Sequence, residues 1–467
     1  MLFIELDKEF KRSYTTQIYR QVREKILSGE LKSGDRLPAT RALASELSVS
    51  RNTILSAYEM LMSEGYVQGV LGSGVYVNHG AQVFNQPEKM VDYQIASLEA
   101  EELSQNMINF DSGIPALDLF PRGKWNRFST QAFNEAPLSA LGYDYPQGRP
   151  EFRSVLAAYL KKVRGVDCSP EQILITTGTK QGLSLIAKCL LNQDSEVWLE
   201  DPTNRNVKQI FSYHTNHITP IAVDAEGIQT NLFPANKVPS FIFVTPSHQF
   251  PMGGILSIQR RLELAQFAKD TECYIVEDDY DSEFRYNGEP VNSLYELNNK
   301  QVIYVGTFSK ILFPSLRLGY LVLPYQLIEQ CREWKRLGDH HSNSINQLAV
   351  MRFIESGELE RHIMRTKKIY GKRRDLLLSL LDKYFPGRIK VYGTPSGMHV
   401  VAEFDGITFS PKLVRRIKDT GTNIVPVENH TLIKGKHTSQ IILGYAHLNQ
   451  TEMEQGIIRI KSVLESY

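Results

Sequence analysis

VGTFSKILFPSLRLGY, residues 305–320, is the stretch that decides the fold of this chain. Lys310 follows an apolar run of the kind that forms a β-strand, hydroxyl side chains flank it at Thr307 and Ser309, and Arg317 comes shortly afterwards. A lysine attacks a carbonyl only when unprotonated, and a partly desolvated pocket with other positive charge nearby lowers its pKa towards that state. Hydroxyls and a guanidinium bind phosphate. The stretch therefore predicts a lysine that forms an imine with a phosphate-bearing aldehyde; a solvated or structural lysine is the alternative for this motif alone.

The composition is that of a globular protein of two or three domains, with 467 residues, of which 42% are hydrophobic and 22% charged. No run reaches the length of a membrane-spanning helix, and the first ten residues lack the features of a signal peptide, so we expect a cytoplasmic protein. The four cysteines form no CxxC pair and no histidine has metal-ligand spacing, so we expect neither a disulfide framework nor a metal site. A net charge of +1 neither supports nor excludes nucleic-acid binding, which would have to depend on a local arrangement of basic residues.

The first eighty residues have the pattern of three helices followed by a hairpin. Apolar spacing and turn signals predict helices over 13–28, 40–47 and 51–64 and strands over 66–70 and 74–77. Two short helices joined by a tight turn form a helix-turn-helix, and a hairpin in this position is a wing. These eighty residues hold ten Lys and Arg against nine Asp and Glu, so bulk charge does not favour DNA, and a small interaction module is the alternative.

The motif SGELKSGDRLPATRALASELSVSRNTILSAYEMLMSEGYVQGVLGSGVYV, residues 28–77, resembles the winged helix-turn-helix of the GntR family of bacterial regulators along its whole length. The resemblance implies that the third helix is a recognition helix for double-stranded DNA. It also implies DNA contacts from both helices and from the wing tip, by Arg41, Arg51, Asn52, Thr53, Gly72 and Ser73. Arg36 is a further candidate.

A polar linker is expected over 79–107, between a first domain at 1–78 and a large domain at 108–467. In the large domain short apolar strands alternate with helices, which predicts an α/β fold with a mainly parallel sheet. The strands are expected over 172–176, 196–199, 241–245, 273–276 and 302–305. Ligands of such sheets bind at the carboxyl ends of the strands. A small C-terminal α+β subdomain is expected over about 334–467.

Four strand ends carry chemically interesting residues. Gly178 and Thr179 open a helix, where free amides favour a phosphate, although an ordinary threonine cap is the alternative. The loop 245–254 and the acidic run 277–281 follow two further strands, and Lys310 follows the fifth. This set, in this order, resembles the fold-type I pyridoxal phosphate (PLP) enzymes of the aspartate aminotransferase superfamily over residues 108–467.

The resemblance implies a role for each matched residue. Lys310 would hold PLP as an internal aldimine, Asp278 would pair with the pyridinium nitrogen, and Tyr280 would bond the ring 3-oxygen. The phosphate would be bound by Gly178, Thr179, Thr307 and Arg317, with Lys180 as a neighbour. Glu277 and Asp279 are interpreted as structural residues of a strand-end salt bridge, and residues 396–399 resemble the segment by which the small subdomain approaches the cofactor.

A GntR-type winged helix ahead of an aminotransferase-like domain resembles the MocR subfamily of GntR-type regulators, whose members include GabR-like proteins. That subfamily implies a PLP-dependent transcriptional regulator, a homodimer through the large domain, that reads repeated half-sites in promoter DNA. A small amine or amino-acid-like effector would displace Lys310, or PLP itself would be the signal. The alternative is a catalytically active aminotransferase with an accessory DNA-binding domain. Whether the chain is an enzyme is left open, because a residual aminotransferase half-reaction is compatible both with a regulator and with an active aminotransferase.

Two positions depart from the pattern. Relatives place an arginine for a substrate carboxylate where this chain has His447, which puts a GABA-type effector in doubt; a histidine packed at a strand end is the alternative. Relatives usually carry a tyrosine near Asn204, and here Arg205 supplies either a stacking plane or a contact to an effector carboxylate. Arg205 and His447 are therefore the predicted effector-binding residues.

Overall fold

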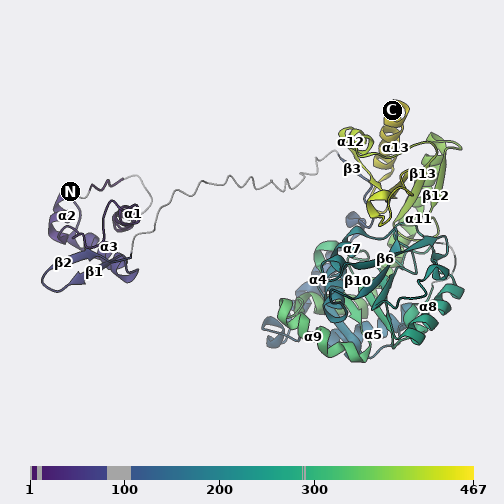
Figure 1. Ribbon diagram of the computed structural model, residues 1–467, viewed down its shortest axis with the longest axis horizontal. Coiled ribbons are helices and arrows are strands. Elements are labelled where there is room, and N and C mark those ends of the chain that lie inside the picture. Colours follow the sequence, from purple (N-terminus) through teal and green to yellow (C-terminus); the bar gives the residue numbers. More distant parts are fainter. Residues whose placement is uncertain (1–2, 8–12, 81–106, 287, 289–290) are drawn as a thin grey trace. The chain divides into compact units, whose positions relative to one another are not determined.

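The computed structural model describes residues 3–7, 13–80, 107–286, 288 and 291–467. It divides into two compact units, Met1–Glu102 and Leu103–Tyr467 (Figure 1). The linker predicted over 79–107 falls almost entirely outside the described residues. Within the described part of the chain, no helix combines the length and the apolar character that crossing a membrane requires.

In residues 13–80, three helices are followed by a two-stranded hairpin. The elements are α1 (Tyr14–Leu27), α2 (Thr40–Glu46), α3 (Arg51–Ser63), β1 (Val67–Val70) and β2 (Gly74–Val77). Ser13 and Ser50 cap α1 and α3, because each hydroxyl accepts a hydrogen bond from a backbone N–H of the first turn. Apolar side chains at helical spacing, among them Ile18, Val22 and Ile54, pack into one core with Val67 and Val77. The predicted winged helix-turn-helix is confirmed.

The described residues of the large unit are organised around an eight-stranded sheet with the order β4-β11-β10-β9-β8-β5-β6-β7. The strands are β4 (Ile173–Thr176), β5 (Glu196–Asp201), β6 (His217–Asp224), β7 (Gly227–Ile228), β8 (Phe241–Val244), β9 (Tyr274–Asp279), β10 (Val302–Thr307) and β11 (Gly319–Val322). The pairs from β10 to β6 are parallel, whereas β11 is antiparallel to both of its neighbours and β7 to β6. The predicted mainly parallel sheet is confirmed; β6, β7 and β11 were not predicted.

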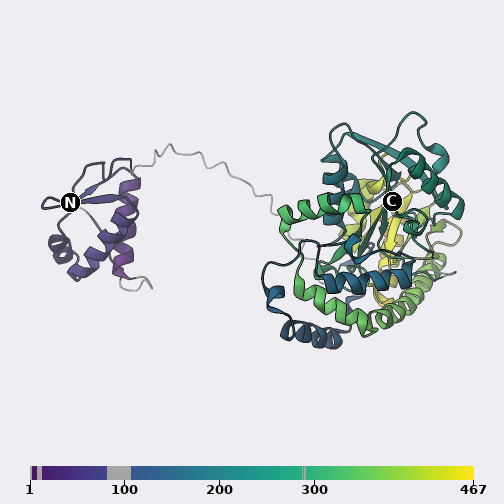
Figure 2. The ribbon, with the colours of Figure 1, turned by 90° about the horizontal axis from the view of Figure 1, so that it is seen from below.

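Helices cover both faces of this sheet (Figure 2). They are α4 (Arg122–Asn134), α5 (Pro150–Arg164), α6 (Thr179–Leu190), α7 (Arg205–Ser212), α8 (Ile258–Thr271) and α9 (Tyr325–Asp339). In β8, Ile242 and Val244 pack into the cluster that contains residues of α5 and α8, and Phe241 and Phe243 into the cluster of α6, α7 and α9. Both faces of the strands are buried, which explains why their sequences are continuous apolar runs rather than alternating ones.

The carboxyl ends of β4, β9 and β10 meet at one edge of the sheet, because these strands point the same way. The strand β11 runs in the opposite direction and begins at that edge, where Gly319 pairs with Thr176 on one side and Thr307 on the other. Arg317, two residues before β11, is thereby delivered to the edge at which Lys310 follows β10. The antiparallel strand thus brings the arginine to the lysine.

The C-terminal part forms a smaller α+β layer. Its elements are α10 (Ser344–Glu355), α11 (Glu358–Tyr384), β12 (Ile389–Tyr392), β13 (His399–Phe404), α12 (Pro411–Asp419), β14 (Thr422–Asn423), β15 (Val425–Pro426), β16 (Gln440–Gly444) and α13 (Gln450–Glu465). Four of the strands form an antiparallel sheet in the order β12-β13-β16-β15. The strand β3 (Ile108–Asn109) pairs with β14, which carries the first described residues of the large unit to this layer. The predicted start of the subdomain, about 334, falls inside α9.

Candidate functional site

A cavity of about 510 Å³ opens at the carboxyl edge of the sheet. It is lined by all seven residues for which the sequence predicted cofactor contacts, namely Gly178, Thr179, Asp278, Tyr280, Thr307, Lys310 and Arg317. These residues come from β4–α6, β9, β10 and the segment before β11. The structure therefore brings together in one place residues that are up to 139 positions apart in the chain, from 178 to 317.

One end of the cavity has the features of a phosphate site. Gly178 precedes α6 with a φ of 124°, a conformation that favours glycine. Gly178, Thr179 and Lys180, at the N-terminus of α6, line the cavity, and a helix N-terminus offers free backbone N–H groups to an anion. A Cβ atom on Gly178 would lie 3.4 Å from Nη1 of Arg317, so the guanidinium lies directly against this turn. Thr307 is also at this end, where its Oγ1 accepts a hydrogen bond from the Ser309 N–H. A helix N-terminus, a hydroxyl and a guanidinium together suit a dianion.

Lys310 supplies the amine of the cavity and is half-buried. Its Nζ donates a hydrogen bond of 2.6 Å to the Gly113 carbonyl oxygen. Burial lowers the pKa of Lys310, and the carboxylates of Asp281 and Asp278 oppose part of that effect. A Cβ on Gly113 would come within 2.7 Å of Nζ, so a larger residue here would displace the amine from its present position. A lowered pKa increases the fraction of the lysine that is unprotonated, and the unprotonated amine is the form that attacks a carbonyl carbon.

Asp278 is the penultimate residue of β9 and lies half-buried beside this amine. Its Oδ1 has no hydrogen-bond partner among the described residues, which is an unusual state for a buried carboxylate oxygen. Burial, followed by the negative charges of Asp279 and Asp281, raises the pKa of Asp278 to about 8. An unpaired carboxylate aimed into a cavity is suited to a ligand that brings an N–H group to it.

We expect Asp278→Asn to stabilise the cofactor-free protein against unfolding by an amount that grows as the pH rises from about 4 to about 8. The pKa of Asp278 is about 8 in the folded state and about 3.9 in an unfolded chain. Between these values the folded state binds more protons, so this carboxyl lowers the free energy of unfolding as pH rises from 4 to 8. The variant should therefore melt higher than the wild type at pH 9 and equally at pH 4.

Thermal denaturation of both cofactor-free proteins at several pH values measures this difference, in which every other titrating group cancels. A difference in melting temperature that does not change with pH would contradict the raised pKa of Asp278. The same variant should hold a cofactor with a protonated ring nitrogen at least about tenfold more weakly, because it loses a charge-assisted hydrogen bond.

Tyr280 is held by a buried network that the sequence analysis did not find. Its hydroxyl donates to the His248 carbonyl oxygen at 3.0 Å and also lies 3.0 Å from His248 Nδ1. The same Nδ1 is 3.1 Å from Oδ2 of Asp281. The loop 245–254, which carries His248, had been recognised as part of the motif, but no sequence signal indicated which of its residues faces the tyrosine.

The other acids of β9 have structural contacts. Asp279 accepts hydrogen bonds from Arg164 at 2.7 Å and from the Tyr304 hydroxyl at 2.5 Å, so its predicted salt bridge is confirmed. Glu277 is instead held by hydrogen bonds from Ser293 and from a backbone N–H. These contacts leave Asp278 as the acid of this strand end that faces the cavity.

The two predicted effector residues lie elsewhere. Arg205 opens α7 and lines a neighbouring hollow of about 310 Å³, not the cavity of Lys310. His447 Nε2 donates a hydrogen bond of 2.7 Å to the Asn109 carbonyl oxygen, and burial lowers the pKa of this histidine. Neither side chain lines the Lys310 cavity, so the structure does not bring them to the amine. Asn204, where relatives have tyrosine, does line it and caps α7 through its side-chain oxygen.

Further residues line the cavity besides the seven predicted cofactor contacts. Among them are Asp111–Ile114, which follow β3, and Phe250, His399 and His430 on the side of the C-terminal layer. His399 belongs to the segment 396–399 that resembled a cofactor-approaching segment, whereas His430 and Asp111 had no motif that would indicate them. They reach the site through the β3–β14 pairing and the four-stranded sheet, which are long-range features.

The predicted DNA-contacting residues are found at the starts of α2 and α3 and at the tip of the β1–β2 hairpin. Arg41, Arg51 and Asn52 are exposed; Thr53 is half-buried, and its N–H donates a hydrogen bond to the Ser50 hydroxyl. Arg51 Nε is 3.4 Å from the Thr40 hydroxyl, so the start of α3 lies beside the start of α2. At the wing, Gly72 has a φ of 75°, and the Ser73 hydroxyl lies 2.6 Å from that of Tyr76. The start of α3 is thus free to enter a groove of DNA.

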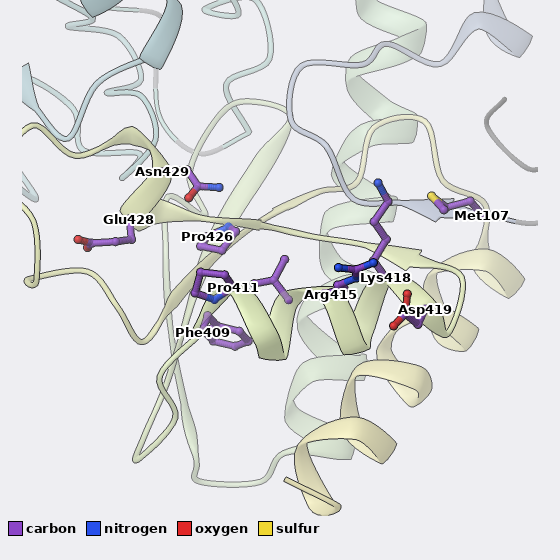
Figure 3. Close-up of a pocket in the computed structure, with 10 residues that line it drawn as sticks. Met107, Phe409, Pro411, Arg415, Lys418, Asp419, Pro426, Glu428 and Asn429 are labelled. Atoms are coloured by element: carbon purple, nitrogen blue, oxygen red, sulfur yellow. The ribbon is translucent and has the colours of Figure 1, made fainter. Parts of the chain in front are cut away.

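A larger hollow of about 750 Å³ lies beside α12 in the C-terminal layer (Figure 3). Its wall combines apolar residues such as Phe409 and Pro411 with charged ones such as Arg415, Asp419 and Glu428. It shares no described lining residue with the Lys310 cavity. Because the wall carries both positive and negative side chains, it favours neither an anionic nor a cationic ligand, and we assign it no ligand.

Two family models match the chain. The model described as "Aminotransferase class I and II" matches residues 105–460, and "Bacterial regulatory proteins, gntR family" matches residues 14–77. Similar proteins include the "Uncharacterized HTH-type transcriptional regulator YdeL" of Bacillus subtilis, 33% identical over 96% of each chain. The "Probable rhizopine catabolism regulatory protein MocR" of Rhizobium meliloti is 30% identical over 98% of this chain and 95% of its own.

Solved aminotransferase structures resemble the large unit. The α-aminoadipate aminotransferase LysN of Thermus thermophilus, solved with N-(5'-phosphopyridoxyl)-L-leucine, has a TM-score of 0.72 and 26% identity, and the match covers 78% of this chain and 94% of that one. The kynurenine aminotransferase of Pyrococcus horikoshii, solved with PMP, has a TM-score of 0.71 and 28% identity, with coverage of 78% and 92%.

The cavity fits pyridoxal phosphate, the cofactor of this aminotransferase family. The unpaired Oδ1 of Asp278 suits a ring N–H, the turn at Gly178 with Arg317 suits the phosphate, and Lys310 suits the aldehyde. The whole arrangement is found in one chain with a GntR-type winged helix. The chain therefore belongs to the MocR-type GntR transcriptional regulators, in which a DNA-binding domain precedes an aminotransferase-like domain that uses pyridoxal phosphate.

Proposed function

We propose that this regulator senses a small primary amine through Lys310 and changes its affinity for promoter DNA in response. The observation that carries the proposal is the state of the lysine. It is a half-buried amine with a lowered pKa, in a cavity that fits the cofactor, and the same chain presents the exposed residues Arg51 and Asn52 at the start of α3. When bound, the cofactor supplies an aldehyde carbon that exchanges one amine for another. An arriving amine would take the place of the Lys310 nitrogen at that carbon, and Lys310 would leave as a free amine.

Three groups of this chain prepare that exchange. With the cofactor bound, Asp278 would hold a proton on the ring nitrogen, Tyr280 would offer its hydroxyl to the ring oxygen, and the turn at Gly178 would hold the phosphate. The released Lys310 becomes a free amine beside Asp278 and Asp281, both of which favour its charged form. A change of charge at a half-buried position is the kind of local event that biases a two-state element, provided that the effector binds the two states unequally.

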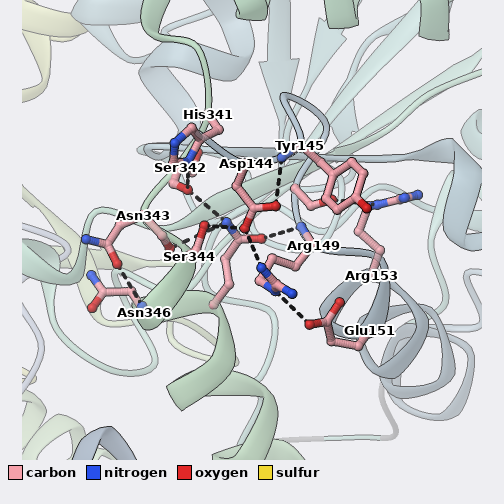
Figure 4. Close-up of polar contacts among 12 residues, drawn as sticks. Asp144, Tyr145, Arg149, Glu151, Arg153, His341, Ser342, Asn343, Ser344 and Asn346 are labelled. Carbon is pink, nitrogen blue, oxygen red and sulfur yellow. Dashed lines mark hydrogen bonds and ion pairs between the residues drawn. The ribbon is translucent and has the colours of Figure 1, made fainter. Parts of the chain in front are cut away.

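We also propose that the protein is a homodimer through the large unit. The segment 138–145 exposes large apolar side chains, with Leu138 87% and Tyr143 88% accessible. It is nevertheless held firmly, because buried Asp144 accepts hydrogen bonds from Ser344, from Arg149 and from a backbone N–H (Figure 4). An exposed apolar segment that is rigidly anchored is typical of an interface. Two small units in such a dimer would read repeated half-sites.

The test compares regulation with turnover in the cofactor-loaded full chain. We expect added amine to change the affinity for the DNA upstream of its own gene by roughly 5–150-fold, the usual range of coupling between sites. Fluorescence anisotropy at fixed salt measures it, with the cofactor-free chain as a second arm that tests whether PLP itself is the signal. DNA affinity that is the same in all arms, together with sustained turnover of an amino donor and a keto acceptor, would favour the active aminotransferase instead.

A further inference from the structure

Two cysteines on neighbouring helices lie in direct contact. Cys189 is in the last turn of α6 and Cys331 is in the middle of α9, 142 positions further along the chain. Both are free thiols, and their Sγ atoms are 3.0 Å apart, so that one S–H donates a hydrogen bond to the other sulfur. Sulfurs that already touch as thiols move closer when they bond. A disulfide between them would therefore draw α6 and α9 together.

The two thiols have different surroundings. Cys331 is fully buried in the apolar cluster of α6, α7 and α9, whereas Cys189 is half-buried at the edge of that cluster. The Cys331 thiol lowers the pKa of Cys189, against the effect of partial burial. The neighbouring Cys189 and then burial raise the pKa of Cys331. Because oxidants react with exposed thiolates, Cys189 has the properties of the thiol that is oxidised first, and Cys331 those of its partner.

The same pair of helices also meets at the phosphate end of the cavity. Gln181, in the first turn of α6, accepts a hydrogen bond of 2.8 Å from the Thr177 N–H. Its side-chain amide donates one of 2.7 Å to Asp339 of α9. Asp339 also accepts from Lys335, which lies one turn after Cys331 on α9. Contacts with α9 thus hold α6 at both of its ends, so a shift between the helices reaches the phosphate end.

We propose that Cys189 and Cys331 are an oxidation site for peroxides, at which a reversible disulfide weakens the hold of the phosphate end on the cofactor. The Cys189 thiolate attacks a peroxide oxygen, the O–O bond breaks, and the leaving oxygen takes up the proton that the thiol had lost. The Cys331 sulfur then attacks the sulfur of the sulfenic acid, the S–O bond breaks, and water leaves with the Cys331 proton. The two thiols lose two electrons and the peroxide gains them.

The reverse reaction needs a low-molecular-weight thiol, whose thiolate attacks the disulfide and is itself oxidised. The inference depends on the cofactor and not on the proposed sensing of amines at Lys310. Its physical basis is that the phosphate end suits the cofactor with α6 in its present position, in which Gly178 lies against Arg317. Drawing the helices together at the cysteines moves this turn away from that position.

The first experiment detects the disulfide in the cofactor-loaded full chain. Hydrogen peroxide should remove the mass of two hydrogen atoms and protect Cys189 and Cys331 from alkylation, and dithiothreitol should reverse both changes. In Cys331→Ala, dimedone should label Cys189 during peroxide treatment, whereas in Cys189→Ala it should not label Cys331. The matched control is Cys168→Ala, which removes another half-buried thiol, one whose pKa burial raises to about 12, and should leave the disulfide unchanged.

The second experiment measures the effect on the cofactor. Loaded wild-type protein is diluted in its reduced and its oxidised form, and the loss of cofactor is followed by visible absorption. We expect the oxidised form to lose cofactor at least about twofold faster, the effect of weakening one hydrogen bond to the phosphate. Peroxide should not change the rate in Cys189→Ala.

Three results would overturn the proposal. They are the absence of a disulfide within one chain after peroxide treatment, equal rates of cofactor loss from the oxidised and reduced wild type, and a peroxide effect that persists in Cys189→Ala. None of these results bears on amine sensing, which is tested separately by the response of the reduced protein to added amine. The two proposals can therefore fail independently.

Discussion

Lys310→Ala should abolish covalent attachment of pyridoxal phosphate. Lys310 is the lysine that lies beside the unpaired carboxylate of Asp278, and its lowered pKa favours the nucleophilic form. The wild-type protein, reduced with borohydride and digested, should carry the cofactor on the peptide that contains Lys310, and the visible absorption of the loaded protein should disappear in the variant. Removing a half-buried amine costs little packing here, so the variant should fold normally.

The matched control is Lys180→Ala, which removes a second positive charge from the same cavity. Because Lys180 lies at the phosphate end, its loss should weaken cofactor binding without preventing the covalent bond. Labelling of another lysine in the wild type, or persistent labelling of the Lys310→Ala protein, would show that the amine has been assigned wrongly. Melting temperatures of both variants establish that the folds are intact.

Arg51→Ala should weaken binding to the DNA upstream of the gene by about 1–3 kcal/mol, the usual cost of losing an arginine that contacts bases or phosphates. Arg51 is exposed on the first turn of α3, next to exposed Asn52, and its guanidinium has one long contact of 3.4 Å to Thr40 within the chain. Its removal therefore takes little from folding stability. Anisotropy titrations with specific and scrambled DNA at the same salt measure the change.

Arg20→Ala is the control for this experiment, since it removes the same charge from an exposed position on α1 of the same unit. We expect it to affect specific binding by less than about threefold, consistent with a general electrostatic contribution. Equal losses in Arg20→Ala and Arg51→Ala would mean that bulk charge, rather than the start of α3, determines affinity.

Much of the fold could be predicted because its signals are local. The strand Phe241–Val244 is a continuous apolar run, and the helix Thr179–Leu190 has an apolar period and a glycine before it. Ser50 and Arg51 mark the start of α3 in the sequence as they do in the structure. Each of these elements depends on residues within about one turn of itself, so reading the chain in order is sufficient.

Local signals could not predict the strand β11 or the contact between Cys189 and Cys331. β11 is only four residues long, and its antiparallel direction depends on pairing with β4 and β10. Cys189 and Cys331, 142 residues apart, lie with their Sγ atoms 3.0 Å from each other, although their sequence spacing indicates no relation. Helix α6 packs on α9 to bring them together, and such packing is set by the whole core.

By itself, the sequence determined which residues can do chemistry: a lysine after a strand, an acid two residues before a tyrosine, a glycine-threonine helix start, and a capped recognition helix. Only the tertiary structure decided what surrounds them. It gave Asp278 an unpaired oxygen, took Arg205 and His447 away from the cavity, and placed His399 and His430 on its wall. The physical reason is that the protonation of a buried group depends on the partners within hydrogen-bond reach. For these histidines the partners are backbone atoms of Pro251, Thr203 and Arg205, more than a hundred residues away in the chain.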